Sequence, residues 1–351
     1  MLDAAALHAA LLTIDTHIDI PWPTGPDPFE DSPRDQTGRR VDFPKMRAGG
    51  LRAGCFAAYV PQGPRTSEGW RAASIQALAM LDTINAMGNA PGNAAERAQD
   101  GIATRITSTA DEIEAAHREG VIAIIPAVEN GHTIGEDLGL LAAFRAKGAR
   151  YLTLTHNGHN ALADSSRPRP DLGDAETLHG GLSELGRGAV AELNRLGMLV
   201  DISHVSTQGA LQAARLSATP VLATHSCIRA LCDVPRNVDD LLLDALRDCG
   251  GMVNITAVAG FVRPGARPEA VTVSDYADHI DYVVKRCGLA HVGISSDFDG
   301  GGGFSGWRDA SESANLTTEL VRRGYDAAEI TALWGGNFLR LLRVAEQAAT
   351  A

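Results

Sequence analysis

Histidine and carboxylate residues stand at the ends of several short apolar runs in this 351-residue chain. His17 and Asp19 lie two residues apart near the end of the run 12–20, and side chains at i and i+2 of a strand point the same way. Other runs end at or just before Glu129, His156, His204, His225, Asp297 and Asp299. Imidazole and carboxylate groups are ligands of Zn²⁺ and similar divalent ions. The set therefore predicts a metal-dependent hydrolase.

The elements that carry these residues alternate between apolar runs and longer amphipathic segments, which is typical of parallel strands joined by helices. We expect strands near 12–20, 51–60, 121–129, 150–156, 198–204, 220–225, 251–257 and 291–297. We expect helices near 67–88, 137–147, 184–197, 206–215, 238–248, 272–287 and 311–323, and an extra C-terminal helix near 326–348. Eight such units predict an α/β fold, a (β/α)8 TIM barrel whose strands end on one rim.

Residues 1–351 are interpreted as a single catalytic barrel domain, with loops at 21–50, 157–182 and 300–306 over the rim. On that rim one carboxylate could bridge two ions about 3.5 Å apart, which can share a hydroxide and polarise a carbonyl. No lysine occurs at a predicted strand end, so a carbamylated lysine is excluded and Glu129 is the candidate bridge.

Each candidate has an ordinary structural alternative. A lone buried histidine is more often a core residue, and an aspartate at a strand end is often a helix cap. Ligand types at several strand ends together make coincidence a poor explanation. His132 and His159 stay ambiguous, and Arg229 and Arg236 could each bind a substrate carboxylate or lie on the surface. A surface position is expected for the remaining histidines, which are His8, His117, His179, His279 and His291.

Composition narrows the class of partner. The formal net charge of −12 argues against nucleic acid or an anionic membrane, because either would favour a basic face. The five cysteines include no CxxC pair, which favours free thiols in a reducing compartment. With no run of about 18 apolar residues and no signal-peptide pattern, we expect a cytoplasmic protein without a membrane anchor. A trimmed leader would make it periplasmic or secreted.

Several ordered motifs resemble those of the membrane dipeptidase (renal dipeptidase) family of the amidohydrolase superfamily. They cover nearly the whole chain: DTHIDIPW at 15–22, YLTLTH at 151–156, GMLVDISHVS at 197–206, THS at 224–226, PRNV at 235–238, HVGISSDFDG at 291–300 and GGNFL at 335–339. The resemblance departs at Asn130, where the family usually has glycine, and at 160–164, which lacks the usual tryptophan. Both positions touch the expected pocket wall and leave the side-chain preference open.

The resemblance implies a ligand set and a reaction. His17, Asp19 and Glu129 would hold one zinc, and Glu129, His204 and His225 would hold the other. His156 would contact the scissile carbonyl, Asp297 would act as acid and base, and Arg236 would bind the substrate's C-terminal carboxylate. Family members are barrel enzymes, often dimers, that cleave dipeptides and tolerate a D-residue at the C-terminal position, and some open a carbapenem ring.

The sequence thus predicts a binuclear zinc dipeptidase, with two zinc ions bridged by Glu129 and a hydroxide. His156 would stabilise the oxyanion, and Asp297 would transfer the proton. The expected partners are a dipeptide substrate and a second copy of the chain. Two alternatives remain: another amidohydrolase reaction, on an N-acyl-amino acid or a cyclic amide, and a catalytically silent barrel that only binds peptides.

Overall fold

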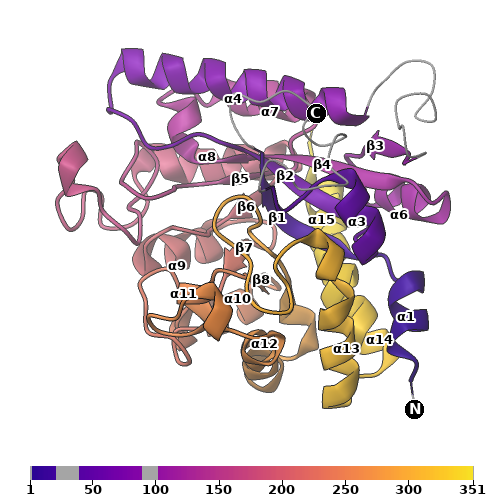
Figure 1. The fold of residues 1–351 in the computed structure, drawn as a ribbon. Helices are drawn as coiled ribbons and strands as arrows, with labels where there is room; N and C mark the ends of the chain where they lie inside the picture. Colours follow the sequence, from indigo (N-terminus) through magenta and orange to yellow (C-terminus); the bar gives the residue numbers. More distant parts are fainter. Residues whose placement is uncertain (1, 21–38, 89–101, 351) are drawn as a thin grey trace.

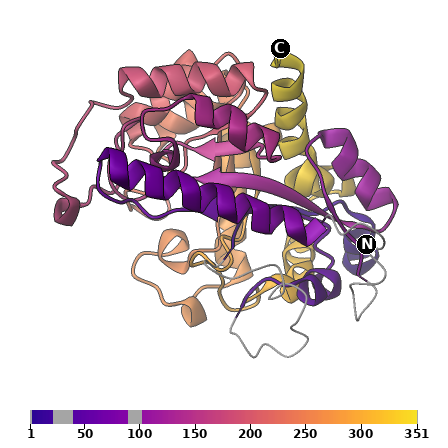
Figure 2. The same cartoon turned by 90° about the horizontal axis from the view of Figure 1, so that it is seen from above.

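The computed structural model of the chain describes residues 2–20, 39–88 and 102–350. Parallel strands form its centre, and helices surround them in both views (Figures 1 and 2). The strands are β1 (Ile14–Asp19), β2 (Ala53–Tyr59), β3 (Thr104–Ile106), β4 (Ile122–Glu129), β5 (Tyr151–Thr153), β6 (Leu199–Asp201), β7 (Leu222–Ser226), β8 (Met252–Ile255) and β9 (Val292–Ile294). Their order is β1-β2-β4-β5-β6-β7-β8-β9, and β3 pairs with the start of β4.

Hydrogen bonds between the first and last strands bring the sheet to a nearly closed barrel. The Asp297 N–H donates to the His17 carbonyl, and the Asp19 N–H donates to the Phe298 carbonyl, both at 3.1 Å. Ile18 and Phe298 form a parallel bridge at the same place. The predicted eight-stranded α/β barrel is confirmed, and β3 is an addition that the sequence pattern does not predict.

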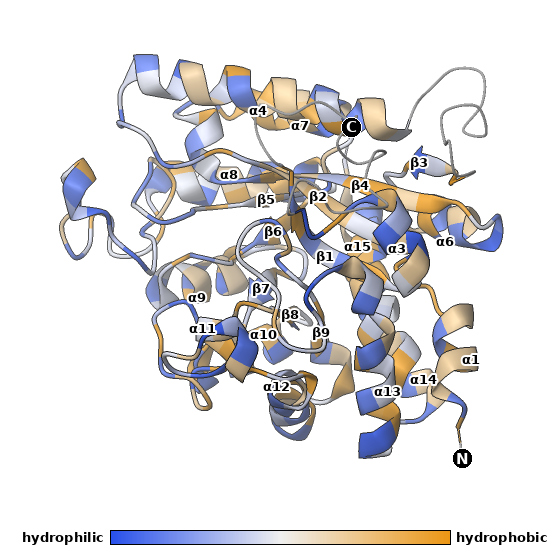
Figure 3. Cartoon of the chain, in the orientation of Figure 1, coloured by the Kyte–Doolittle hydropathy of each residue, from blue (hydrophilic) through white to orange (hydrophobic). Residues whose placement is uncertain are grey.

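Helices on the outside follow the strands. They are α1 (Ala4–Ala10), α3 (Phe43–Gly49), α4 (Ser67–Gly88), α6 (Ala110–Arg118), α7 (Gly139–Ala146), α8 (Glu184–Arg195), α9 (Thr207–Leu216), α10 (Asp240–Asp248), α11 (Ala259–Val262), α12 (Val273–Cys287), α13 (Ala314–Arg323), α14 (Ala327–Thr331) and α15 (Asn337–Ala348). Hydrophilic and hydrophobic residues alternate along α4 and α13 in Figure 3, as expected for helices with one buried face.

Two predictions about helices need correction. The segment 43–49, predicted as part of a loop, is α3, because Asp42 caps it and Pro44 occupies its first turn. Residues 21–38 of that predicted loop lie outside the described residues. The extra C-terminal helix is interrupted by a π turn over 332–336, where a side chain on Gly335 would meet the Leu12 carbonyl at 2.8 Å. The sequence pattern also misses α1, α6 and α11.

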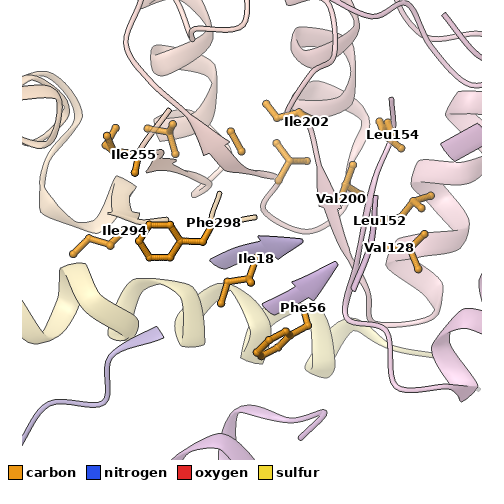
Figure 4. Close-up of a cluster of buried hydrophobic side chains, with 14 of the residues drawn as sticks. Ile18, Phe56, Val128, Leu152, Leu154, Val200, Ile202, Ile255, Ile294 and Phe298 are labelled. Atoms are coloured by element: carbon orange, nitrogen blue, oxygen red, sulfur yellow. The ribbon is translucent and has the colours of Figure 1, made fainter. Parts of the chain in front are cut away.

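Alternate residues of the strands pack into two hydrophobic clusters. In β4, Val128 belongs to an outer cluster with helix residues such as Met80 of α4. Figure 4 shows strand residues of this outer cluster, among them Ile18. Ile125 of β4 instead belongs to a second cluster, which fills the barrel interior. This interior cluster contains one or more residues of almost every strand, and also Phe338 of α15. Glu129 continues the interior-facing row of β4 to its carboxyl end.

A bulge in β1 turns His17 inward. Between Asp15 and Ile18, β1 advances by three residues while β2 advances by two, so β1 has one extra residue. Ile14 lies in the interior cluster, and a regular alternation from it would direct His17 outward and Ile18 inward. The extra residue reverses this alternation. Ile18 therefore faces the outer cluster, away from His17 and Asp19.

The same irregularity recurs in β7. Between Ala223 and Ser226, β7 advances by three residues while β8 advances by two. Leu222 lies in the interior cluster, so a regular strand would direct His225 toward the helices. Both bulges thus bring a predicted ligand to the barrel interior.

Two of the histidines expected on the surface are buried. His8 contacts Thr317 Oγ1 and the Gly49 carbonyl, each at 2.7 Å, and His279 contacts the Ile228 N–H and the Val262 carbonyl. Both lie on helix faces packed against the barrel, where both ring nitrogens find partners, so the surface prediction is wrong for these two. All five cysteines are free thiols. Among the described residues, no helix combines the length and apolar character needed to cross a membrane.

Candidate metal centre and active site

Glu129, at the carboxyl end of β4, lies at the centre of the predicted ligands. Its Oε2 atom is 3.4 Å from His17 Nε2, and Asp19 Oδ1 is 3.2 Å from the same nitrogen. Its Oε1 atom is 3.2 Å from His204 Nε2 and 3.3 Å from His225 Nε2. The two oxygens of one carboxylate therefore face two different groups of ligand atoms.

A hydrogen bond on the far side of the His17 ring fixes which nitrogen faces Glu129. The Tyr151 hydroxyl donates to the Thr16 carbonyl at 3.1 Å, so it accepts from His17 Nδ1 at 2.9 Å. With a proton on Nδ1, the neutral ring has a lone pair on Nε2. That lone pair points at the carboxylates of Asp19 and Glu129, an arrangement that is repulsive unless a cation lies between them.

His225 is oriented by a similar chain of hydrogen bonds. Thr224 Oγ1 donates to Asp201 Oδ2 at 2.7 Å, so it accepts from His225 Nδ1 at 2.8 Å. Thr153 Oγ1 donates to the same Asp201 oxygen at 2.6 Å, and both Asp201 oxygens are fully buried among such donors. The chain leaves a lone pair on His225 Nε2, which lies 2.9 Å from His204 Nε2 and can act as a ligand beside Glu129.

The donor atoms fit a divalent metal ion. Two ligand atoms of a tetrahedral ion with bonds of about 2.1 Å are about 3.4 Å apart, close to the separations around Glu129. Asp19, Glu129 and Asp297 also place three carboxylates in one buried site, where positive charge is needed to offset them. Burial lowers the pKa of His17, but the charges of Glu129 and Asp19 outweigh burial and raise this pKa well above 6.5. The field that attracts a proton to His17 would equally attract a cation.

All five predicted ligands are brought together, with His156 and Asp297 beside them. Three overlapping sets of atoms could each hold an ion: His17, Glu129 and His225; Glu129, His156 and His204; His17, Asp19 and Asp297. Glu129 belongs to two of the three sets. The sets differ from the division that the resemblance implies, because His225 is grouped with His17 and His156 joins His204.

Backbone strain is concentrated at this rim. Among the described non-glycine residues, positive φ occurs only at Asn130 (87°), His204 (67°), Asp297 (58°) and Asp299 (64°). Each follows a barrel strand, and all four are predicted site residues or their close neighbours. Such conformations cost on the order of 1–3 kcal/mol each and tend to occur at functional sites.

His156 and Asp297 have displaced pKa values. Burial lowers the pKa of His156 to about 4, and the charge of Glu129 opposes this shift only in part. His156 is therefore neutral at pH 7, with Nδ1 3.3 Å from the Tyr59 hydroxyl. Burial raises the pKa of Asp297 well above 3.8; the charges of Asp19 and Glu129 add to this rise, and those of His17 and Arg236 oppose it only in part. Asp297 is thus poised to hold a proton.

Arg236 faces the same cavity, which has a volume of about 280 Å³. The side chain is only 3% exposed. Its Nη1 donates to Ser226 Oγ at 3.2 Å and its Nη2 donates to the His225 carbonyl at 3.0 Å, while Nε has no partner among the described residues. Burial lowers the pKa of Arg236 to about 10, so the group is still a cation at pH 7. A fixed cation beside the ligands suits a substrate carboxylate.

Other candidates take structural roles in the described chain. Arg229 pairs with Asp239 at 3.5 Å, away from the cavity. Asp299 accepts the backbone N–H groups of Arg40 and Val41 and so anchors the segment before α3. His132 contacts the Gln62 amide at 3.1 Å. The remaining ambiguous histidine, His159, contacts the Ala175 carbonyl and the Ser165 N–H.

Sequence reasoning missed several residues that support the site, namely Tyr59, Tyr151, Asp201, Thr224, Arg167 and Phe261. Tyr151 begins a predicted strand, and Asp201 and Thr224 stand inside strands beside predicted ligands. A polar residue within an otherwise apolar buried strand is the signal that could have found them, since a buried polar group needs a partner. Arg167 and Phe261 lie on loops or short helices, where no periodicity identifies them.

A nearly closed α/β barrel with histidines and carboxylates clustered on its carboxyl rim defines an amidohydrolase-like metal-dependent hydrolase. The model of the family "Membrane dipeptidase (Peptidase family M19)" matches residues 1–351, and the chain belongs to this family. The predicted class, a metallo-dipeptidase-type hydrolase, is thereby confirmed.

Individual relatives agree with this family. Dipeptidase aclJ from Aspergillus oryzae is 34% identical over 319 residues, which is 90% of this chain and 72% of that protein. In three other curated dipeptidases the aligned part spans 60%, 55% and 59% of the relative's length.

Solved structures agree as well. The probable dipeptidase PvdM from Pseudomonas aeruginosa has a TM-score of 0.88 at 29% identity, with 99% of this chain and 98% of that chain covered. A metallo peptidase from Rhodobacter sphaeroides, liganded with a phosphinate mimic of the dipeptide L-Ala-D-Ala, has a TM-score of 0.79 at 28% identity, with 95% and 99% covered.

Proposed function

We propose that the chain is a binuclear zinc dipeptidase that hydrolyses dipeptides with a free C-terminal carboxylate. The observation that carries this proposal is the position of Glu129, whose two oxygens face His17 on one side and His204 and His225 on the other. This geometry supports a carboxylate bridge between two ions, one also held by Asp19. When bound, the ions would polarise the scissile carbonyl and make a water molecule acidic enough to react at neutral pH.

The chain's own residues would bind the substrate and move the proton. Arg236 would hold the C-terminal carboxylate with its guanidinium, so the enzyme would be an exo-acting dipeptidase rather than an endopeptidase. Tyr59 would donate to His156 Nδ1, so that the neutral ring offers its Nε2–H to the developing oxyanion. Asp297 would accept the proton of the attacking water and deliver it to the leaving amine, a role that its raised pKa supports.

A D-residue at the C-terminal position should be accepted, because its carboxylate can reach the same guanidinium. The Rhodobacter sphaeroides metallo peptidase bound to a mimic of L-Ala-D-Ala supports this extension. We further propose that residues 1–351 act as one catalytic domain. The homodimer and the cytoplasmic location stay predictions, which light scattering and cell fractionation would test.

Metal analysis joined to a substrate panel tests the proposal. Elemental analysis after chelation and zinc reloading should return close to two ions per chain, as expected for two ions that share Glu129. The reloaded enzyme should cleave dipeptides and leave N-acetyl-amino acids and cyclic amides uncut. A folded protein that holds a single ion would contradict the binuclear site. Cleavage of N-acetyl-amino acids in preference to dipeptides would favour the other amidohydrolase reaction.

A further inference from the structure

Two arginines share one aromatic ring at the edge of the catalytic cavity. The guanidinium carbon of Arg236 lies 5.3 Å from the centre of the Phe261 ring, and that of Arg167 lies 5.1 Å from it. All three residues line the cavity. The two guanidinium carbons can therefore be no farther apart than the sum of these two distances. A single amino acid with two carboxylates can bridge this span when each carboxylate contacts one guanidinium group.

Arg167 has no carboxylate partner among the described residues. Its neighbour in the same loop, Arg169, pairs with Asp171, and Arg65, which reaches the same loop, pairs with Asp174. The described residues give the Arg167 guanidinium no hydrogen bond or ion pair, and it lies over the Phe261 ring, although it is half-buried and burial lowers its pKa. A cation that loses hydration without gaining a counter-charge is costly, which is unusual for a purely structural residue.

The backbone of Arg167 is nevertheless fixed to the site. Its N–H donates to Ser165 Oγ at 3.2 Å, and its carbonyl accepts the Gly158 N–H at 2.8 Å. Ser165 Oγ in turn donates to the carbonyl of His156. These contacts hold the base of the side chain at a defined position beside His156, so its placement at the cavity is a property of the folded loop.

We propose that Arg167 is a specificity-determining residue that binds a second substrate carboxylate, the one in the side chain of the C-terminal residue. The preferred substrates would then be dipeptides that end in aspartate or glutamate. This inference rests on the proposed dipeptidase function, in which Arg236 holds the main-chain carboxylate. Because Arg167 lies against the same ring as Arg236, the second carboxylate belongs to the same residue, and Phe261 would pack against its methylene groups.

Matched acid and amide substrates test this assignment. The zinc-loaded enzyme should be given Ala-Asp against Ala-Asn and Ala-Glu against Ala-Gln, with the second residue in the L and in the D form. We expect kcat/KM to favour the acid by roughly 5- to 30-fold, the effect of one charge-assisted contact in a partly exposed site. Arg167→Gln should remove this preference, and Arg167→Lys should keep part of it. The control Arg169→Gln removes the same charge two residues away and should keep the wild-type ratio.

A binding measurement separates failure of this inference from failure of the proposed function. Calorimetric titration should show that the wild-type protein binds aspartate more tightly than asparagine. The Arg167→Gln variant should bind the two amino acids with equal affinity. If dipeptides are cleaved but acid and amide substrates react alike, Arg167 has no such role and the dipeptidase proposal stands. A preference for acids that survives Arg167→Gln overturns the assignment as well. If no dipeptide is cleaved, the dipeptidase proposal fails, and the titration alone decides whether Arg167 distinguishes the two amino acids.

Discussion

Replacing Thr224 by valine should weaken metal binding without touching a ligand. Thr224 is fully buried, donates to Asp201 and accepts the Nδ1–H of His225. Valine keeps the shape but removes the hydroxyl, which leaves the His225 Nδ1–H without an acceptor. The proton is then no longer fixed on Nδ1, and the tautomer with a lone pair on Nε2 loses its advantage. Loss of such an outer partner typically lowers metal affinity by about 10- to 100-fold, or about 1.4–2.8 kcal/mol.

The chain offers a close control for this variant. Thr153 is also fully buried and donates to the same oxygen of Asp201 at 2.6 Å, but it has no hydrogen bond to His225. Thr153→Val and Thr224→Val should each lower the free energy of unfolding of the metal-free protein, by about 1–3 kcal/mol for a lost hydrogen bond in the interior. Only Thr224→Val should lower metal affinity, and Thr224→Ser, which retains a hydroxyl, should restore it.

Competition with chelators of graded strength would measure the affinity of each ion, and denaturant titration of the metal-free protein would measure stability. We expect one of the two ions to dissociate more readily from Thr224→Val, because His225 contacts a single oxygen of Glu129. If Thr224→Val binds both ions as tightly as the wild type, the hydrogen-bond chain from Asp201 does not orient His225. Equal affinity losses in Thr224→Val and Thr153→Val would point to a general disturbance of Asp201.

Three further predictions concern chemistry and pH. Asp297→Asn should keep both metals and the fold, since asparagine tolerates the φ of 58°, but lose kcat by about 10²- to 10⁴-fold; near-normal turnover with full metal content would remove Asp297 from proton transfer. The wild type should prefer a dipeptide acid over its amide by about 10- to 150-fold in kcat/KM, and Arg236→Met should abolish that preference; equal cleavage by the wild type would disprove the clamp. Burial lowers the pKa of His132 to about 4, so the unfolded chain binds more protons between about pH 6.5 and 4, and stability should fall as the pH decreases through this window. Urea midpoints at pH 7 and pH 5 should differ less in His132→Gln than in the wild type.

The barrel and the position of the candidate ligands on its rim could both be predicted from the sequence. Each depends on a different pattern, and the two patterns lead to the same arrangement. Continuous apolar runs of strand length identify the buried strands, and a polar residue at the end of a run identifies the rim. Neither signal is specific for one residue such as His204 or His225. The prediction came from their repetition on several strands, since the strands of a parallel barrel must all end on the same side.

The bulges could not be predicted. His17 and His225 face the interior only because β1 and β7 each carry one extra residue relative to a neighbour. Strict alternation from Ile14 or Leu222 would direct both histidines outward, and the sequence contains no residue that marks the irregularity. Register depends on pairing between strands that are distant in sequence, so a pattern within one strand does not determine it.

Loop residues were missed for a related reason. Arg167 reads as an ordinary arginine in a loop rich in proline and glycine, like Arg169 two residues later. The two arginines differ in their surroundings. Arg167 lies at the cavity against Phe261, whereas Arg169 pairs with Asp171. Substrate preference is therefore the part of the function that sequence patterns indicate least, whereas candidate ligands, which require defined residue types, are the easiest to propose.

Backbone strain and buried negative charge occur together at the carboxyl rim of the barrel. His204 and Asp297 are held at positive φ, and Glu129 lies nearly unexposed beside His17 and His225, whose protonated nitrogens point away from it. Neither feature favours folding by itself, because strain and unpaired buried charge both cost free energy. The interior and outer hydrophobic clusters of the barrel supply stability that can offset both costs. The side chains at the rim can therefore keep an arrangement that is complementary to metal cations, as a preformed metal site requires.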